Sequence, residues 1–207
     1  SYTNEISYTV GLESGYYGVK ATLEGKTVTS STSYDLGTNT VPVNGAILYK
    51  FNSVTGTTMQ NGSGNVRLQN LWTDANKAYM VVFGNASDIR IQDSTDNAHI
   101  ESTEFAPGID QSFDLSQPFE LLIKDNSINN STTPIQYWLK YGDREGFILL
   151  AEYGYATAAE RTPIISATGT ATANIESITI YECPDPVAEE DFSIYDDLVV
   201  LTDGTSS

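Results

Sequence analysis

Residues 135–153, IQYWLKYGDREGFILLAEY, decide the fold class of this chain. In Ile135–Tyr141 the odd positions are apolar or aromatic and the even positions hold Gln, Trp and Lys, so successive side chains face opposite sides of a strand. The run Phe147–Ala151 is continuously apolar, as in a strand buried on both faces. Between them, glycines flank the charged triplet Asp143–Glu145. The stretch therefore predicts two antiparallel strands joined by a solvent-facing turn at 142–146, and not an active-site loop.

Similar windows recur along the whole chain, separated by turn residues such as Glu24-Gly25. Helical periodicity is almost absent, and only Thr157–Arg161 is helix-friendly enough for a single turn. The predicted strands are Glu5–Val10, Tyr16–Leu23, Thr27–Ser33, Gly45–Asn52, Asn65–Asn70, Ala78–Phe83, Asp88–Gln92, His99–Phe105, Phe119–Lys124, Ile135–Tyr141, Gly146–Tyr153, Ile164–Thr168, Asn174–Glu182 and Ser193–Leu201. Short strands at regular spacing without crossover helices predict an all-β, two-sheet antiparallel β-sandwich of jelly-roll or concanavalin-like type.

Alternation also assigns side chains to faces, although it leaves open which face is the core. In Asn174–Glu182 it places Ile178 and Ile180 on one face with Glu176 and Glu182, and Ile175 and Tyr181 on the other. Trp138 lies opposite to its neighbours Tyr137 and Leu139, and either side of that strand could face the interior.

The pattern changes after residue 182, where Cys183-Pro184-Asp185-Pro186 interrupts it. We expect a β-sandwich domain at 1–182 and an acidic extension at 183–207 that consists of a linker and a terminal strand. That strand could complete the domain's own sheet, pair with a neighbouring subunit as an assembly segment, or lead to a further domain. Its apolar residues are Ile194, Leu198, Val199, Val200 and Leu201.

Charge and composition exclude several classes of partner. The net charge of −17 and a pI near 4.1 argue against nucleic acid and against an anionic membrane surface. Residues 182–207 alone hold eight acidic side chains and no Lys or Arg. No apolar run approaches the ~18 residues of a membrane-spanning helix, so we expect no membrane insertion. A single cysteine, Cys183, excludes an intrachain disulfide.

Residues 118–182 resemble the end of a concanavalin A-like or laminin-G-like jelly-roll domain. The similarity lies in the succession PFELLIKD, IQYWLKYGD, GFILLAEYG and ATANIESITIYE, in which the last segment alternates like the closing strand of that family. The resemblance implies a β-sandwich and, by association, a role in binding carbohydrate or protein.

Catalytic constellations are sparse. Concanavalin-like glycosidases carry a Glu-x-Asp-x-Glu or Glu-x-Asp-x-x-Glu strand, and neither Glu101 with Glu104 nor Asp143 with Glu145 reproduces it. Alginate lyases of the same sandwich need a His in a Gln-Ile-His motif, whereas the only histidine, His99, lies between Ala and Ile. We therefore expect a non-catalytic protein, with a polysaccharide-degrading enzyme that uses carboxylates such as Glu145 as the remotest alternative.

Two kinds of ligand site remain as candidates. Aromatic side chains that could stack on the apolar face of a sugar are Trp72, Trp138, Tyr16 and Tyr17. Carboxylates that could hold Ca²⁺ are Asp88, Asp93 and Asp96, although their spacing is not that of an EF-hand. A solvated hairpin in which Asp and Asn make side-chain turns is the favoured interpretation of these residues.

The sequence thus favours an extracellular, cell-surface or virion protein with a structural or adhesive role that self-associates through β-sheet contacts. The abundance of Ser, Thr, Asn and Tyr and the acidic charge support this reading. The alternative is a lectin-like, carbohydrate-binding module, with glycans as partners and calcium as a cofactor.

Overall fold

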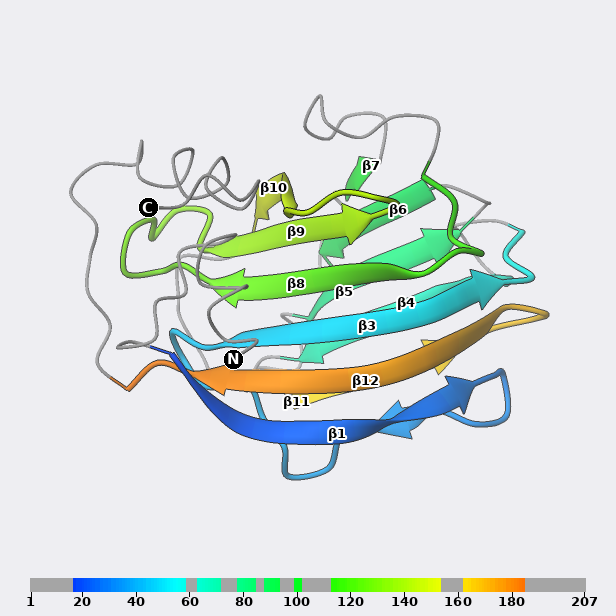
Figure 1. Ribbon diagram of the computed structural model, residues 1–207, viewed down its shortest axis with the longest axis horizontal. Helices are drawn as coiled ribbons and strands as arrows, with labels where there is room; N and C mark the ends of the chain where they lie inside the picture. Colours follow the sequence, from blue (N-terminus) through cyan, green and yellow to red (C-terminus); the bar gives the residue numbers. More distant parts are fainter. Residues whose placement is uncertain are drawn as a thin grey trace.

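The computed structural model describes residues 17–58, 63–71, 78–84, 88–93, 99–101, 113–153 and 162–184. They form two six-stranded antiparallel sheets packed face to face (Figure 1). The front sheet contains, in spatial order, β1 (Gly18–Val28), β12 (Thr172–Glu182), β3 (Ala46–Thr55), β8 (Phe119–Asp125), β9 (Ile135–Tyr141) and β10 (Ile148–Tyr153). The back sheet contains β2 (Tyr34–Asp35), β11 (Thr162–Ala167), β4 (Val66–Leu71), β5 (Ala78–Gly84), β6 (Asp88–Asp93) and β7 (His99–Glu101). The predicted two-sheet β-sandwich is confirmed.

An aromatic group holds the two sheets together at the centre of the core. Phe51 of β3 stacks on Phe119 of β8, with ring centroids 4.7 Å apart. Phe83 of β5, in the back sheet, meets both rings edge-on, at 5.5 Å from Phe51 and 5.4 Å from Phe119. All three side chains are buried, so this contact joins the front and back sheets through densely packed apolar surface.

The hairpin predicted at 142–146 is confirmed. Strands β9 and β10 pair antiparallel on either side of it. Gly142 has a φ of 61°, a left-handed conformation that glycine adopts without steric cost. Arg144 folds back over the ring of Tyr141, with its guanidinium carbon 3.9 Å from the ring centroid, and Asp143 and Glu145 are exposed. The charged triplet is therefore a turn at the rim of the sandwich.

The prediction of a chain reversal at Glu24-Gly25 is wrong. Strand β1 continues through both residues to Val28 and pairs with β12 along its length. A Cβ at position 25 would overlap the carbonyl oxygens of Ile175 and Glu176, so glycine is required here for close approach of two strands rather than for a turn. The reversal falls at Thr29–Thr32, inside the predicted strand 27–33, and is followed by the short β2.

The predicted faces of the last strand are partly wrong. Ile175, Ile178 and Ile180 are all buried in the core between the sheets. The register of β12 against β3 shifts on both sides of Ile175, so that Glu176 opposes no residue of β3. Such a bulge resets the alternation, which lets isoleucines three residues apart face the same side while Glu176 stays exposed.

A hydrogen-bonded junction links the start of β4 to the loop after β11. The Thr168 hydroxyl oxygen accepts hydrogen bonds from the backbone N–H groups of Gly64 (3.0 Å) and Asn65 (3.1 Å). The same hydroxyl donates to the side-chain oxygen of Asn65 at 3.1 Å, and Arg67 donates to that oxygen at 3.0 Å. Asn65 is fully buried, so these bonds satisfy polar groups that water does not reach.

Replacing Thr168 with valine should therefore lower the free energy of unfolding by about 1–3 kcal/mol, because the two N–H groups lose their acceptor while the side-chain volume is kept. Urea denaturation followed by circular dichroism measures the change. Thr170→Val is the matched control, since the Thr170 hydroxyl is exposed and donates only to the carbonyl oxygen of Gly56. Equal effects of the two substitutions would contradict the assignment.

Candidate functional site

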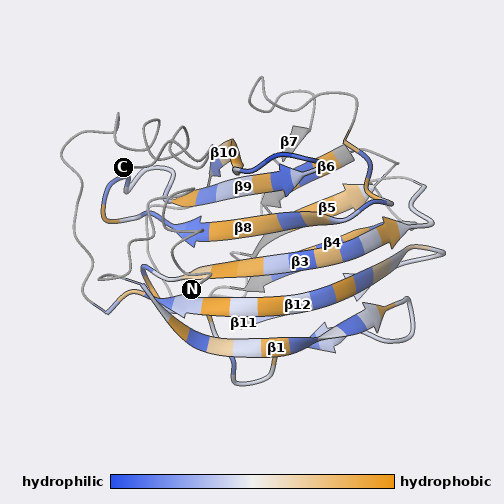
Figure 2. Cartoon of the chain, viewed as in Figure 1, coloured by the Kyte–Doolittle hydropathy of each residue, from blue (hydrophilic) through white to orange (hydrophobic). Residues whose placement is uncertain are grey.

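The outer face of the front sheet, which points away from the back sheet, carries side chains in rows that run across the strands. Cross-strand register sets these rows, because paired residues of neighbouring strands point to the same side. The middle row consists of Leu48, Leu122 and Trp138. On one side of it lies a row of Ala46, Lys124 and Gln136, and on the other side lies a row of Lys50, Glu120 and Lys140. Figure 2 shows the resulting hydrophobic and hydrophilic bands along the front strands.

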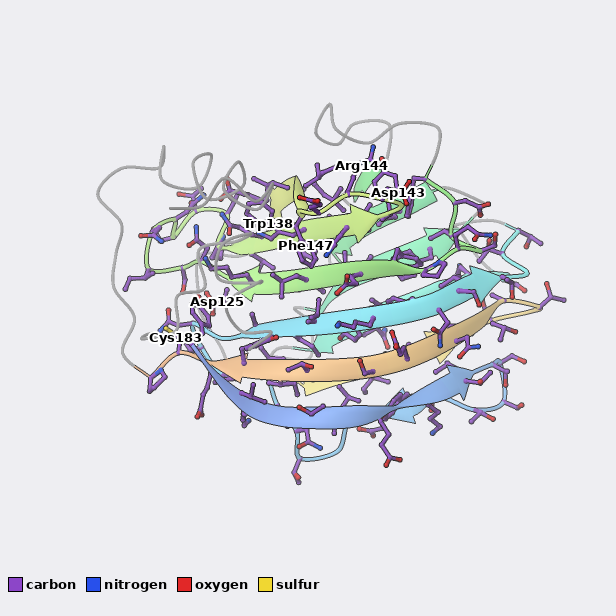
Figure 3. The ribbon with its side chains drawn as sticks, in the orientation of Figure 1. Asp125, Trp138, Asp143, Arg144, Phe147 and Cys183 are labelled. Atoms are coloured by element: carbon purple, nitrogen blue, oxygen red, sulfur yellow. The ribbon has the colours of Figure 1, made fainter. Side chains whose placement is uncertain are left out.

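One part of this face is apolar and buried. We call it the outer apolar cluster; its members are Ala46, Leu48, Leu122, Trp138, Phe147 and Tyr181. Their exposed fractions are 0–3%. Trp138 and Phe147 lie together over the front sheet, next to the hairpin turn (Figure 3). Both faces of β9 are thus buried. Tyr137 and Leu139 lie in the main core between the sheets, and Trp138 lies in the outer apolar cluster.

Two of the aromatic residues proposed for sugar stacking meet in this cluster. Trp138 is 2% exposed, and Tyr17 packs partly buried against the same cluster. The indole N–H of Trp138 donates to the side-chain oxygen of Gln136 at 3.3 Å. The Trp138 ring is therefore buried in this arrangement, and a sugar-stacking role for it stays a prediction. Tyr16 and Trp72 lie outside the described residues.

A chain of polar side chains borders the cluster at β10. The amides of Gln136 and Asn130 each approach the same carboxylate oxygen of Glu152, at 3.5 Å and 3.3 Å. Gln136 is 2% exposed, so its amide is held between Trp138 and Glu152 rather than by solvent. This network orients the Trp138 ring, and no sequence motif indicated it.

The remaining part of the outer face is charged and open. Lys50, Glu120 and Lys140 stand side by side, and each ammonium group lies 3.8 Å from an oxygen of Glu120. Together with Glu176 of β12 and Gly142 of the hairpin they line a depression of 210 Å³, which we call the charged depression. The Lys50, Glu120 and Lys140 side chains are 41%, 25% and 18% exposed. The site therefore offers paired cations and carboxylates that a ligand can reach.

No sequence motif marks the charged depression. Lys50 comes from β3, whereas Glu120 and Lys140 come from the consecutive strands β8 and β9, and none of the three belongs to a recognisable motif. The available signal was the alternation itself, which puts Lys50, Glu120 and Lys140 on the polar side of three predicted strands. Only the register of those strands shows that the three charges form one row.

The calcium hypothesis is not supported by the backbone. Asp88 and Asp93 are the first and last residues of β6, so about 3.3 Å per residue separates their Cα atoms by roughly 16 Å. Ligands of one calcium ion lie 2.3–2.6 Å from it, which is incompatible with a site shared by these two residues. Asp96 lies outside the described residues, and the described part of the chain contains no group of three or more His, Cys, Asp or Glu side chains suited to a metal.

The other predicted features fall largely outside the described residues. These include the strand at 5–10, Glu104, and the assembly segment with Ile194, Leu198, Val199, Val200 and Leu201, which stays a prediction. His99 and Glu101 belong to β7, and only their backbone is described. The described residues include no helix long and apolar enough to span a membrane.

Solved structures with a similar fold include carbohydrate-binding domains. The CBM40 of Ruminococcus gnavus IT-sialidase bound to α2,3 sialyllactose matches with a TM-score of 0.51 and 14% identity, over 89% of this chain and 99% of its own. The same domain bound to α2,6 sialyllactose also gives 0.51 and 14%, over 89% and 100%. Fructofuranosidase from Schwanniomyces occidentalis, complexed with fructose, gives 0.52 and 12% over 84% of this chain and 35% of its own.

At these identities the likeness establishes the fold alone. The protein is an all-β sandwich of jelly-roll-like architecture, as the resemblance over residues 118–182 implied. No protein-family model matches the chain, and no curated protein matches it.

Proposed function

We propose that this protein is a non-catalytic carbohydrate-binding domain whose ligand occupies the charged depression. The observation that carries the proposal is the open row Lys50–Glu120–Lys140 on the outer face of the sandwich. Sugar hydroxyls both donate and accept hydrogen bonds, so they complement a row in which carboxylate acceptors stand beside ammonium donors. Hydrogen bonds to such charged groups are stronger than those between neutral groups.

The fold comparison supports the carbohydrate-binding alternative more than a structural or adhesive role. The domain from Ruminococcus gnavus is a carbohydrate-binding module that was solved with sialyllactose, and it matches over nearly its whole length. We infer that the ligand here is a glycan with both hydroxyl and carboxylate groups, of which sialyllactose is the first to test. Lys50 and Lys140 would receive its carboxylate, and Glu120 and Glu176 its hydroxyls.

Binding of α2,3 and α2,6 sialyllactose and of uncharged lactose, measured by isothermal titration calorimetry, tests the proposal. We expect sialyllactose to bind more tightly than lactose. Lys140→Ala should weaken binding about 10- to 100-fold, since a hydrogen bond to a charged group contributes roughly 1.5–3 kcal/mol and each 1.4 kcal/mol is tenfold. Glu120→Gln should weaken it as well, because an amide is a weaker acceptor for the ligand hydroxyls than the carboxylate it replaces.

Lys20→Ala is the matched control, because it removes the same charge from an exposed lysine of β1 whose ammonium group donates to the Thr40 carbonyl oxygen. Its binding should equal that of the wild type. Unchanged binding in both Lys140→Ala and Glu120→Gln would place the site elsewhere on the molecule. Absence of binding to all three glycans and to a broad glycan array would overturn the proposed function itself.

A further inference from the structure

The sign of the charge alternates from strand to strand along the charged depression. Strands β12, β3, β8 and β9 are neighbours in the front sheet (Figure 1). Glu176 of β12 and Lys50 of β3 come first, and Glu120 of β8 and Lys140 of β9 follow. Neighbouring strands lie about 4.8 Å apart, so roughly 14 Å separate the first of these strands from the last. The depression therefore has an acidic end at Glu176 and a basic end at Lys140.

A bulge in β12 supplies the acidic end. The register of β12 against β3 skips Glu176, and Ser177 is the residue that pairs with Lys50. Glu176 is thus an extra residue of the strand, and its exposed side chain lines the depression beside Lys50. Gly25 of β1 leaves room for this geometry, because a Cβ there would overlap the carbonyl oxygens of Ile175 and Glu176. The position of the Glu176 carboxylate therefore depends on the bulge and on the close approach of β1.

The two lysines of the depression are not equivalent. Lys50 lies between the strands that carry Glu120 and Glu176, so it has a carboxylate residue on each side. Lys140 has Glu120 on one side, and on the other its ammonium group lies 6.0 Å from the centre of the Phe147 ring. The Lys140 side chain is also less exposed, at 18% against 41% for Lys50, so water screens its charge less. An incoming anion therefore meets less repulsion and stronger attraction at Lys140.

We propose that the charged depression binds an acidic glycan in one orientation, with the carboxylate of the glycan at Lys140 and its hydroxyls at Glu176. This inference rests on the proposed function and adds the residue that sets the orientation. The negative charge of Glu176 disfavours a ligand carboxylate at the neighbouring Lys50, while its oxygens accept hydrogen bonds from hydroxyls. The ligand class is thus a glycan that has a carboxylate at one end and uncharged hydroxyls at the other.

Binding of α2,3 sialyllactose, measured by isothermal titration calorimetry, tests the orientation in the full-length chain. Lys140→Ala should weaken binding about 10- to 100-fold and Lys50→Ala less than about 3-fold. In a Glu176→Gln background the loss caused by Lys140→Ala should be at least about 3-fold smaller. The reason is that Lys50, no longer beside a second carboxylate, can then hold the carboxylate of the ligand.

Glu182→Gln is the matched control, because it makes the same change at an exposed residue at the end of β12. In that background the loss caused by Lys140→Ala should equal the loss in the wild type. The replaced side chains lie on the outer face, so far-UV circular dichroism of every variant should match that of the wild type.

Equal losses in Lys50→Ala and Lys140→Ala would overturn the orientation. A loss at Lys140 that Glu176→Gln leaves unchanged would overturn it as well. In both cases the wild type still binds sialyllactose, so the proposed function would stand and only the orientation would be lost. A wild type that binds no glycan would overturn the proposed function, and the orientation with it.

Discussion

Phe51→Ala is expected to lower the free energy of unfolding by about 3–5 kcal/mol. The Phe51 ring is 2% exposed and stacks on Phe119 of the same sheet while Phe83 of the back sheet meets it edge-on. Removing the Phe51 ring eliminates apolar burial and leaves a cavity at the contact between the two sheets. The two sheets cannot move closer to fill this cavity without breaking hydrogen bonds between their strands. Urea denaturation, with the midpoint and slope fitted together, measures the loss.

Two further substitutions separate packing from other causes. Phe51→Leu keeps most of the volume and should cost about 1–1.5 kcal/mol. Val19→Ala, at a position that is 43% exposed, should change stability by less than about 0.5 kcal/mol. A Phe51→Ala variant as stable as Val19→Ala would show that the rings do not join the sheets.

Asp125→Ala is expected to lower the free energy of unfolding by about 2–5 kcal/mol. Asp125 is 2% exposed, and its two carboxylate oxygens accept hydrogen bonds from the backbone N–H groups of Asn44 (3.0 Å) and Ser127 (2.9 Å). Asn44 has a φ of 64°, a left-handed conformation that Asn adopts more readily than most residues with a Cβ, and the bond to Asp125 holds the backbone of the loop before β3 in this conformation. Each buried donor left without an acceptor costs about 1–3 kcal/mol.

Asp125→Asn provides the graded comparison. The amide keeps one acceptor oxygen, so one of the two backbone donors stays satisfied and the expected loss is about half as large. Thermal unfolding of both variants, followed by circular dichroism, shows which of them loses more stability. Asp125→Asn as damaging as Asp125→Ala would mean that the negative charge, and not the two hydrogen bonds, stabilises this loop.

The alternation in residues 135–153 predicted the hairpin and, extended along the chain, the fold class. It succeeded because the direction of successive side chains in a strand is a local property. It failed at β12, where a bulge beside Ile175 depends on how β3 pairs with that strand. The turn signal at Glu24-Gly25 also failed, because the role of Gly25 follows from the close approach of two strands that are distant in sequence.

The candidate site was less predictable than the fold. Trp138 was identified as a notable aromatic, but its burial depends on what packs over the outer face, which alternation does not describe. Lys50, Glu120 and Lys140 were ordinary polar positions of three separate strands, and they became one charged row only through register. The proximity of these charged side chains results from the pairing of strands, so the sequence of a single segment does not reveal it.

Strand period, turn residues and net charge are properties of short segments or of their sum, so they were enough to predict a sandwich of antiparallel strands and an acidic chain. The tertiary structure alone decided which side of Trp138 is interior, where the strands bulge and which charges meet. Burial and strand register arise from contacts between two segments of the chain. Such a contact depends on both segments, so the sequence of either one alone does not determine it.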